Sequence, residues 1–597
     1  MQVIIPAAGM GKRLGDATSD KTKCMVQLGD KTLIEHCLDS IVKHDISRII
    51  LVVGFEKDKL KNFLGHKYKN IDIVYVDNDI YDKTNNIYSI FLAKEYLVED
   101  DTILIESDLV FEPKIFEMVL ENKFENLAVV DKYRAWMDGT VVKINDDFSI
   151  SHFIPKNSFN YHEADNYFKT VNIYKFSKDF LKEIYVPFLE AYSKALGNNE
   201  YYEQVLKVIV NLDSNNLKAL PLNGQRWYEI DDIQDLENAN IIFSTPEKKY
   251  DLLSSRYGGY WRFDDLIDFC YLVNPYFPPE KMKDEINFSL MELIQSYPSS
   301  QQVQSMLAGK MFNLPSENIA VGNGAAELIN VMTDSLKIKF GIYGPTFDEY
   351  TERFENIDLN KSNNEGFEYF SSDIIKLASK NDGVILINPD NPTGNFISYK
   401  DIIKILDNFK LTNKTLVLDE SFIDFAKNGF ESTTLKKDIL EKYKNLIVIK
   451  SIGKSYGIGG LRLGVVASSN KELILKIKKD LSIWNINSIS EFYLQIFSKY
   501  SEHYKDSCKK IIKARESLFK KLDDIDYLKP YPSQANYIFC KLINKDSKKL
   551  CTELCDKYSI LIKDCSQKKN INDNYIRIAV RDTRDNDYLI NSLIALS

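Results

Sequence analysis

Histidine and cysteine are scarce in this chain, with six and eight copies among 597 residues. The histidines form no cluster, which argues against a histidine-based metal site and against a serine–histidine catalytic triad. The cysteines lack the spacing of a disulfide framework or a zinc site, and Cys551 and Cys555 are spaced as packing residues on one helix face would be. Scattered cysteines of this kind are typical of the reducing cytoplasm, where we expect the protein to work.

A basic excess and long hydrophobic runs are also absent. The formal net charge of −9 argues against a nucleic-acid partner, because no surplus of lysine and arginine exists to neutralise phosphates. No apolar run reaches the length that crosses a membrane. Residues 1–6 lack the basic region and the long apolar stretch of a secretory signal. We therefore expect a cytoplasmic protein with small-molecule partners and no membrane insertion.

The hydrophobic content of 44% and the charged content of 27% are ordinary for a globular protein. A chain of this length exceeds one hydrophobic core, so two or three domains are expected. Apolar runs alternate with helical spacing, which predicts α/β domains with largely parallel sheets. Strands are expected at residues 2–6, 48–54, 71–76, 102–105 and 127–130, and at 341–343, 384–388, 416–419, 446–449 and 463–467. A linker at 241–256 is expected to join a domain of residues 1–240 to one of residues 257–597.

A loop of small residues follows the first apolar run and consists of Ala7, Ala8, Gly9, Met10, Gly11, Lys12 and Arg13. Small side chains leave backbone N–H groups open to phosphate oxygens. The positive side chains of Arg13, in the loop, and Lys23, shortly after it, could neutralise the charge of a triphosphate. Such a loop alone also fits an ordinary turn between a strand and a helix, so further features are needed.

Three later segments carry side chains suited to a nucleotide and its metal ion. Donors and acceptors that can read a base come from Asn85, Asn86 and Ser89. Glu106 and Asp108 follow an apolar run whose carboxyl end would face the crevice of the sheet. Asp231 supplies a second carboxylate much later in the chain. Two carboxylates from distant segments suit Mg²⁺, which prefers few protein carboxylates together with phosphate oxygens.

Together these residues resemble the nucleotidyltransferases that activate sugars and phospho-amines, above all the CTP:phosphocholine cytidylyltransferase branch, over residues 1–240. The resemblance implies a Rossmann-like domain whose loop 7–13 binds the CTP phosphates, with Lys23 and Arg13 as catalytic residues. Thr22 stands where the family usually has proline. The implied nucleotide site extends to Asn85, Asn86, Ser89 and Glu106. The implied Mg²⁺ ligands are Asp108 and Asp231, with Glu229 as the competing choice. An acceptor oxygen would attack the α-phosphorus of CTP and release pyrophosphate.

The acceptor of this branch carries an amine. Trp136, Tyr201 and Tyr202 lie in the regions where the branch holds that amine. Aromatic faces suit an ammonium group. Core packing is the alternative interpretation for each of the three residues.

The second half contains, in order, the residues that a pyridoxal phosphate site requires. Asn391 lies in an unusual turn at residues 388–394, Asp419 ends an apolar run, and Lys454 and Arg462 follow. The cofactor needs a partly deprotonated amine to hold its aldehyde and a carboxylate to keep its pyridine nitrogen protonated. It also needs donors for its phenolate oxygen and its phosphate. A single lysine in this lysine-rich chain would be a surface residue, but the ordered set distinguishes Lys454.

Residues 250–597 resemble fold-type I aminotransferases, most closely the histidinol-phosphate aminotransferase and threonine-phosphate decarboxylase group. The resemblance implies a large α/β domain, a small α+β domain and a homodimer. Lys454 would hold the cofactor and Asp419 its pyridine nitrogen. The remaining implied cofactor residues are Ala325, Ala326, Phe347, Asn391, Ser451, Arg462 and, from the neighbouring subunit, Tyr297. The implied substrate residues are Arg577, Asn274 and Asn536. Phe422 stands where many aminotransferases have tyrosine, a feature shared with decarboxylases.

The combination resembles fused phosphonate enzymes in which a 2-aminoethylphosphonate transaminase is joined to a 2-aminoethylphosphonate cytidylyltransferase. We expect the second domain to make 2-aminoethylphosphonate from phosphonoacetaldehyde and an amino donor, and the first to convert it to its CMP derivative. A phosphoserine or phosphothreonine decarboxylase coupled to a phosphoethanolamine or phosphocholine cytidylyltransferase is the main rival hypothesis. A regulatory or binding protein without activity is a second, and two unlinked activities fused for co-expression are a third.

Overall fold

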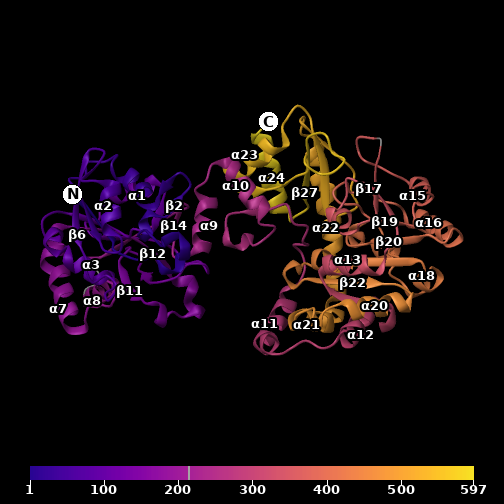
Figure 1. Ribbon diagram of the computed structural model, residues 1–597, viewed down its shortest axis with the longest axis horizontal. Coiled ribbons are helices and arrows are strands. Elements are labelled where there is room, and N and C mark those ends of the chain that lie inside the picture. Colours follow the sequence, from indigo (N-terminus) through magenta and orange to yellow (C-terminus); the bar gives the residue numbers. More distant parts are fainter. Residues whose placement is uncertain (213–215, 363) are drawn as a thin grey trace. The chain divides into compact units, whose positions relative to one another are not determined.

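The computed structural model describes residues 1–212, 216–362 and 364–597. The chain divides into two compact units, Met1–Leu253 and Ser254–Ser597 (Figure 1). The expected linker at 241–256 is largely helical: α9 (Ile233–Ile242) ends in it, and α10 (Pro246–Ser255) occupies most of the rest. Pro246 begins α10, where its missing N–H costs nothing because the first N–H groups of a helix have no intrahelical partner.

The N-terminal unit contains a ten-stranded sheet whose main path runs β11–β10–β12–β7–β1–β4–β6–β5. Its parallel centre consists of β7 (Thr102–Ile105), β1 (Gln2–Ala7), β4 (Ile49–Val53) and β6 (Ile71–Asp77), all expected from the sequence. The two faces of this centre belong to different cores, because Val3 and Ile5 pack into one buried cluster and Ile4 into the other. Burial on both faces explains why these strands are continuous apolar runs.

Beyond β7 the same sheet becomes mostly antiparallel, which the sequence did not predict. The strands β12 (Phe168–Phe176), β10 (Val141–Ile144) and β11 (Ile150–Ile154) pair in antiparallel fashion. The expected strand β9 (Leu127–Lys132) joins β12 antiparallel and β13 (Lys218–Pro221) parallel. The largely parallel sheet that we expected is therefore correct for the centre of the unit and wrong for this edge.

The C-terminal unit contains a seven-stranded sheet in the order β16–β22–β21–β20–β19–β17–β18. Its strands are β16 (Ile319–Asn323), β17 (Phe340–Gly344), β18 (Ile357–Lys361), β19 (Gly383–Ile387), β20 (Thr415–Asp419), β21 (Leu446–Ser451) and β22 (Leu463–Ala467). Strand β22 runs antiparallel to both of its neighbours, and the strands from β21 to β18 are parallel.

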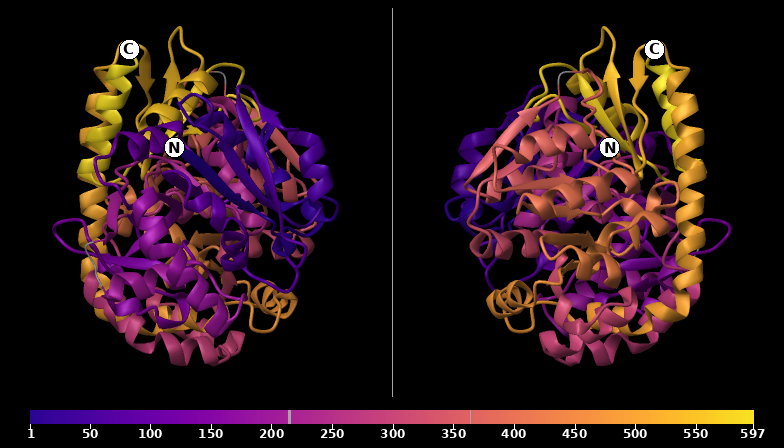
Figure 2. Two further views of the ribbon diagram at one scale, coloured as in Figure 1. Left: turned by 90° about the vertical axis from the view of Figure 1, so that its left-hand side faces the viewer. Right: turned by 90° about the vertical axis from the view of Figure 1, so that its right-hand side faces the viewer.

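A second, antiparallel sheet of this unit has the order β23–β24–β27–β26, with β23 (Leu528–Pro530) and β26 (Lys563–Asp564) at its edges. Its two central strands are β24 (Tyr537–Leu542) and β27 (Tyr575–Ala579). The long helix α22 (Ser501–Asp523) packs against this sheet and against α24 (Thr583–Ala595) (Figure 2). No helix in the described parts of the chain is both long and apolar enough to cross a membrane.

The strand ends position the candidate functional residues. Strand β1 ends at Ala7, at the start of the small-residue loop, and β7 ends just before Glu106. In the C-terminal unit β20 ends in Asp419, and β21 leads into the short helix α19 (Ile452–Ser455), which contains Lys454. In open α/β sheets the carboxyl ends of parallel strands face the ligand crevice.

Candidate active sites

A cavity of about 1080 Å³ lies in the N-terminal unit. It brings together most of the residues expected at the nucleotide site: Ala8, Gly9, Gly11, Lys12, Arg13, Lys23, Asn85, Asn86, Ser89 and Glu106. Ala7 is instead buried as the last residue of β1, and Met10 is half-buried beside the cavity-lining Gly9 and Gly11. The loop, the helix start near Asn86 and the end of β7 therefore enclose one space.

The ammonium group of Lys23 lies between two carboxylates. Its Nζ is 2.5 Å from Oδ2 of Asp108 and 2.8 Å from Oδ1 of Asp231. Arg13 Nη2 lies 2.8 Å from the same Asp231 oxygen. Burial disfavours a charged Lys23, but Asp108 and then Asp231 outweigh it and hold the pKa of Lys23 above its usual range. Lys23 is therefore a permanent positive charge in the cavity.

The loop is fixed to the Lys23 segment by a glycine and a threonine. Gly11 has φ of 63°, and a Cβ at this position would lie 3.1 Å from atoms of Lys23 and Thr18, so only glycine fits without strain. The hydroxyl of Thr22 donates to the carbonyl oxygens of Ala7 and Gly9, at 3.2 and 3.1 Å. These hydrogen bonds give a physical role to the threonine that replaces the usual proline.

The carboxylates around Lys23 fit an Mg²⁺ ion that is shared with substrate phosphates. Oδ1 of Asp108 is buried without a hydrogen-bond partner, so it is available to a cation. Glu229 is already engaged, because it accepts from Asn172 Nδ2 at 3.0 Å and pairs with Lys169 Nζ at 3.2 Å. Asp231 is engaged as well, by Lys23 and Arg13, so the second Mg²⁺ ligand stays a choice between Asp231 and Glu229. In the described residues no group of three or more potential ligands is arranged for a metal, so phosphate oxygens would have to complete the coordination.

Asn86 holds neighbouring segments together. Its Nδ2 donates to Glu106 Oε1 at 3.0 Å, and its Oδ1 accepts from the backbone N–H of Tyr202 at 3.1 Å. Asn85 caps helix α3 (Asn86–Leu92), and Ser89 Oγ lies 3.3 Å from Asn78 Nδ2. Ser89 and Asn85 line the cavity as expected, whereas the amide of Asn86 is occupied at both ends.

The three aromatic residues expected near the amine have different positions. Tyr201 lines the cavity and is largely exposed. Tyr202, the next residue, is fully buried. Trp136 stacks on Tyr228, with the ring centroids 4.5 Å apart, and packs against two core clusters. Core packing, which the sequence left open for all three residues, therefore accounts for Trp136.

In the C-terminal unit the amine of Lys454 lies between two aromatic rings. Its Nζ is 5.1 Å from the centroid of Phe347 and 4.6 Å from that of Phe422. Burial lowers the pKa of Lys454 to about 8, against the opposing effect of Asp419, and Arg577 and Arg462 lower it further. Such an amine is partly deprotonated near neutral pH, as a lysine that attacks an aldehyde must be.

Asp419 is oriented by a residue that the sequence analysis missed. The Tyr350 hydroxyl donates to Oδ2 of Asp419 at 2.9 Å, and the backbone N–H of Ser421 donates to Oδ1 at 2.9 Å. Both Asp419 and Tyr350 are buried. Tyr350 lies three residues after Phe347, and helical spacing on α14 (Asp348–Arg353) was the only signal that could have found it. A buried, oriented carboxylate is suited to hold a protonated pyridine nitrogen.

A cradle for an anion forms where α13 (Gly324–Ser335) begins. Ala325 and Ala326 lie in its first turn, whose N–H groups have no intrahelical partners. Gly324 has φ of +79°, and a Cβ there would lie 2.7 Å from Arg462 Nη2, so the guanidinium lies against this helix start. Ser451 is buried at the end of β21, and its N–H donates to Ser421 Oγ at 2.9 Å. Ala325, Ala326 and Arg462 match the expected phosphate site.

Arg577 reaches the turn that contains Asn391. Its Nη1 donates to Asn391 Oδ1 at 2.7 Å, and its Nε is buried without a partner, so a donor remains for an anionic ligand. Asn536 likewise keeps a buried Oδ1 without a partner. The amide of Asn274, in contrast, donates to Ser455 O and Ser507 Oγ at 3.0 and 2.9 Å. Asn274 thus has a positioning role beside Lys454.

Tyr297 is 78% exposed in the single chain and packs against Trp484 in a tilted arrangement, with the ring centroids 4.5 Å apart. This exposure is compatible with a role in a second subunit, which the sequence resemblance implies. The dimer remains a prediction.

The lowered pKa of Lys454 predicts how the cofactor-free protein captures pyridoxal phosphate. Because the neutral amine is the reacting form, the rate should rise as the pH increases through about 8 and should level off above it. Visible absorbance follows the capture, and Lys454→Ala should show none. A rate that stays flat across this range would contradict the lowered pKa.

The hydrogen bond from Tyr350 to Asp419 gives a second prediction. Tyr350→Phe should lower the turnover of the pyridoxal-phosphate domain about tenfold, because one hydrogen bond to a charged group contributes about 1.5 kcal/mol. Tyr343→Phe is the control, because Tyr343 lies on β17, shortly before Tyr350 in the chain, and the turnover should not change. Equal turnover of wild type and Tyr350→Phe would show that Asp419 is oriented without this hydroxyl.

Comparison with known proteins agrees with both units. Residues 264–593 match the family described as aminotransferase class I and II, and residues 3–137 match the MobA-like NTP transferase domain. The CMP-5'-(3-aminopropyl)phosphonate synthase of Streptomyces rubellomurinus is 27% identical over 99% of this chain and 94% of its own length.

Two further relatives match only the C-terminal unit. The L-serine phosphate decarboxylase of Campylobacter jejuni is 30% identical over 55% of this chain and 87% of its own length. The crystal structure of the histidinol-phosphate aminotransferase from Clostridium acetobutylicum has a TM-score of 0.51 and 26% identity, and the match covers 55% of this chain and 99% of that one. The chain therefore belongs to the aminotransferase class I and II family, and it is an enzyme that joins such a pyridoxal-phosphate-dependent domain to an N-terminal NTP transferase domain.

Proposed function

We propose that the chain is a bifunctional enzyme that makes 2-aminoethylphosphonate by transamination and converts it to CMP-2-aminoethylphosphonate with CTP. The observation that carries this proposal is the similarity to a phosphonate–CMP synthase along 99% of the chain, across both units. The cationic and acidic groups in the N-terminal cavity support the same conclusion, because the acceptor would carry both charges.

In the N-terminal unit, Lys23 and Arg13 would neutralise the phosphates of CTP while the N–H groups of the loop bind phosphate oxygens. Asp108 and Asp231 would hold Mg²⁺, which supplies charge neutralisation at the phosphates. An oxygen of the acceptor phosphonate forms a bond to the α-phosphorus, and the bond from that phosphorus to pyrophosphate breaks. The protein contributes position and fixed positive charge.

In the C-terminal unit, Lys454 would hold pyridoxal phosphate, with Asp419 at the ring nitrogen, Asn391 at the phenolate oxygen and the start of α13 at the phosphate. The bound cofactor supplies an electron sink that lets an amino group pass from a donor to an aldehyde. Arg577 binds the acidic group of the substrate, and the neutral form of Lys454 moves the proton at the reacting carbon. Tyr297 from a second subunit would complete this site in a homodimer.

One observation favours a second candidate for this half. Phe422 lies over the Lys454 amine where many aminotransferases have a hydroxyl, and an L-serine phosphate decarboxylase is 30% identical to this unit. The candidate is decarboxylation of a phosphorylated amino acid, coupled to cytidylyl transfer to the resulting phospho-amine.

The two candidates predict different products. With phosphonoacetaldehyde and an amino donor, the full chain should form 2-aminoethylphosphonate, detected by ³¹P NMR. With phosphoserine it should release no CO₂. Lys454→Ala should abolish the formation of 2-aminoethylphosphonate and leave cytidylyl transfer intact. Lys23→Met should lower the rate of cytidylyl transfer by about 10²-fold or more and leave transamination intact. Release of CO₂ from phosphoserine without any transamination would establish the second candidate.

A further inference from the structure

Two glutamates in the N-terminal cavity that are not exposed, Glu106 and Glu203, lack the cationic partners that Asp108, Asp231 and Glu229 have. Asp108 and Asp231 share Lys23, and Glu229 pairs with Lys169. Glu203 and Glu106 also line the cavity, but in the described parts of the chain neither forms an ion pair. Among the residues that the structure describes, the one side chain that donates a hydrogen bond to Glu106 is the neutral amide of Asn86, at 3.0 Å.

Of the two glutamates, Glu203 is the one whose buried carboxylate oxygen has no hydrogen-bond partner among the described residues. It is only 8% exposed, and the oxygen without a partner is Oε2. It is the first residue of α8 (Glu203–Leu212), where the helix favours an anion. A buried carboxylate without a partner is costly, so natural proteins retain one chiefly where a ligand completes it.

The surroundings of these carboxylates disfavour two bare negative charges, which a proton or a bound cation would relieve. Burial raises the pKa of Glu203, more than its own backbone N–H and Lys169 lower it. Burial, and then the charges of Asp108, Glu203 and Glu229, raise the pKa of Glu106. The buried hydroxyls of Tyr185 and Tyr202, which interact electrostatically with Glu106 and Glu203, also lack hydrogen-bond partners among the residues that the structure describes. A bound cation would relieve this accumulation of negative and unsatisfied oxygens.

The geometry distinguishes among three kinds of cation. Within the described chain, the carboxylates do not form a group of three that could hold a metal ion. A quaternary ammonium group has no N–H and is bound best by an aromatic cage, whereas here Tyr201 is 55% exposed and Trp136, which does not line the cavity, is stacked on Tyr228. A primary ammonium group has three N–H donors and matches separate carboxylate oxygens.

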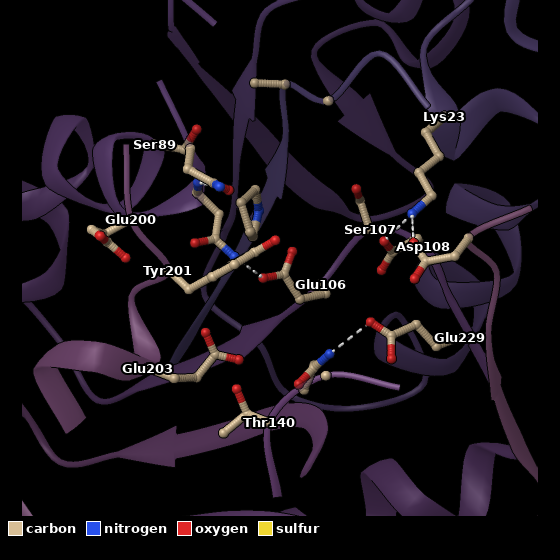
Figure 3. A pocket seen from close by; sticks show the side chains of 18 of the residues that line it. Lys23, Ser89, Glu106, Ser107, Asp108, Thr140, Glu200, Tyr201, Glu203 and Glu229 are labelled. Atoms are coloured by element: carbon tan, nitrogen blue, oxygen red, sulfur yellow. Dashed lines mark hydrogen bonds and ion pairs between the residues drawn. The ribbon is translucent and has the colours of Figure 1, made fainter. Parts of the chain in front are cut away.

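The ion-paired Lys23 and the glutamates that lack an ion pair lie on different sides of the cavity. Figure 3 shows Lys23 and Asp108 together on one side, with Glu203, Glu200 and Tyr201 on the other and Glu106 between them. A small molecule with an acidic end and an ammonium end therefore has one favourable orientation. Its acidic end faces Lys23, where the reaction with CTP would occur.

We propose that Glu203, together with Glu106, forms the subsite that binds the primary ammonium group of the acceptor and selects it over neutral and quaternary acceptors. This inference rests on the proposed cytidylyl transfer and assigns to it two carboxylates that phosphate binding does not require.

The test compares acceptors in the full chain at saturating CTP, with pyrophosphate release as the readout. The acceptors are 2-aminoethylphosphonate, its N-trimethyl analogue and 2-hydroxyethylphosphonate. Wild type should prefer the primary amine. Glu203→Gln should raise KM for 2-aminoethylphosphonate about 30-fold or more, because a buried charge pair loses one member. KM for CTP and the use of 2-hydroxyethylphosphonate should stay unchanged.

The control is Glu183→Gln, an exposed glutamate of the same unit that is absent from the cavity lining. Glu203→Gln should also leave the Tm of the ligand-free protein unchanged or raise it, because an unpaired buried charge is removed. If this variant loses CTP use altogether, Glu106→Gln provides a second comparison, in which the preference among the three acceptors is the readout because Glu106 is also an expected nucleotide-site residue.

Three results would overturn the inference. A wild-type enzyme that transfers CMP but prefers the trimethyl analogue would contradict the primary-ammonium assignment. If both glutamine variants keep the wild-type preference for the amine, the proposed ammonium subsite is wrong, whereas the proposed cytidylyl transfer is unaffected. If the wild-type enzyme uses none of the acceptors, both the proposed cytidylyl transfer and the proposed subsite are wrong.

Discussion

The ammonium group of Lys23 holds the N-terminal cavity together. It joins the segment that contains Lys23 to the end of β7 through Asp108 and to the segment after β14 (Trp227–Glu229) through Asp231. These segments are far apart in the sequence, and each ends or begins at a strand. Without this positive charge, Asp108 and Asp231 would repel each other in a largely enclosed space. The contact therefore fixes both the shape of the phosphate side and its charge.

The two proposed reactions use lysine in opposite electrostatic states. Two carboxylates raise the pKa of Lys23, so it stays charged and attracts phosphates. Burial between Phe347 and Phe422 lowers the pKa of Lys454 to about 8, so a fraction is neutral and nucleophilic. Lysine suits both roles because its amine responds strongly to its surroundings, unlike the guanidinium of arginine. An enzyme that binds a small zwitterion twice needs this difference, since its two sites handle opposite ends of the molecule.

The sequence predicted what depends on local pattern. The buried parallel strands β1, β4 and β7 are continuous apolar runs, and Lys23, Asp108, Asp419 and Lys454 follow strands or short motifs. The antiparallel edge around β12 was missed, because the direction in which strands pair depends on tertiary contacts and not on local pattern. Glu203 was missed because it belongs to no motif and its meaning lies in the absence of a partner. Tyr350 and the packing role of Trp136 likewise depend on tertiary contacts.

The central claim is that one chain makes a small phosphonate amine and then activates it. The most direct test gives the full chain phosphonoacetaldehyde, an amino donor and CTP together and follows the phosphorus species by ³¹P NMR. The account predicts CMP-2-aminoethylphosphonate and pyrophosphate, with no product from Lys454→Ala until 2-aminoethylphosphonate is added. A Lys454→Ala enzyme that stays inactive after this addition, or a wild-type enzyme that accumulates the amine without consuming CTP, would contradict it.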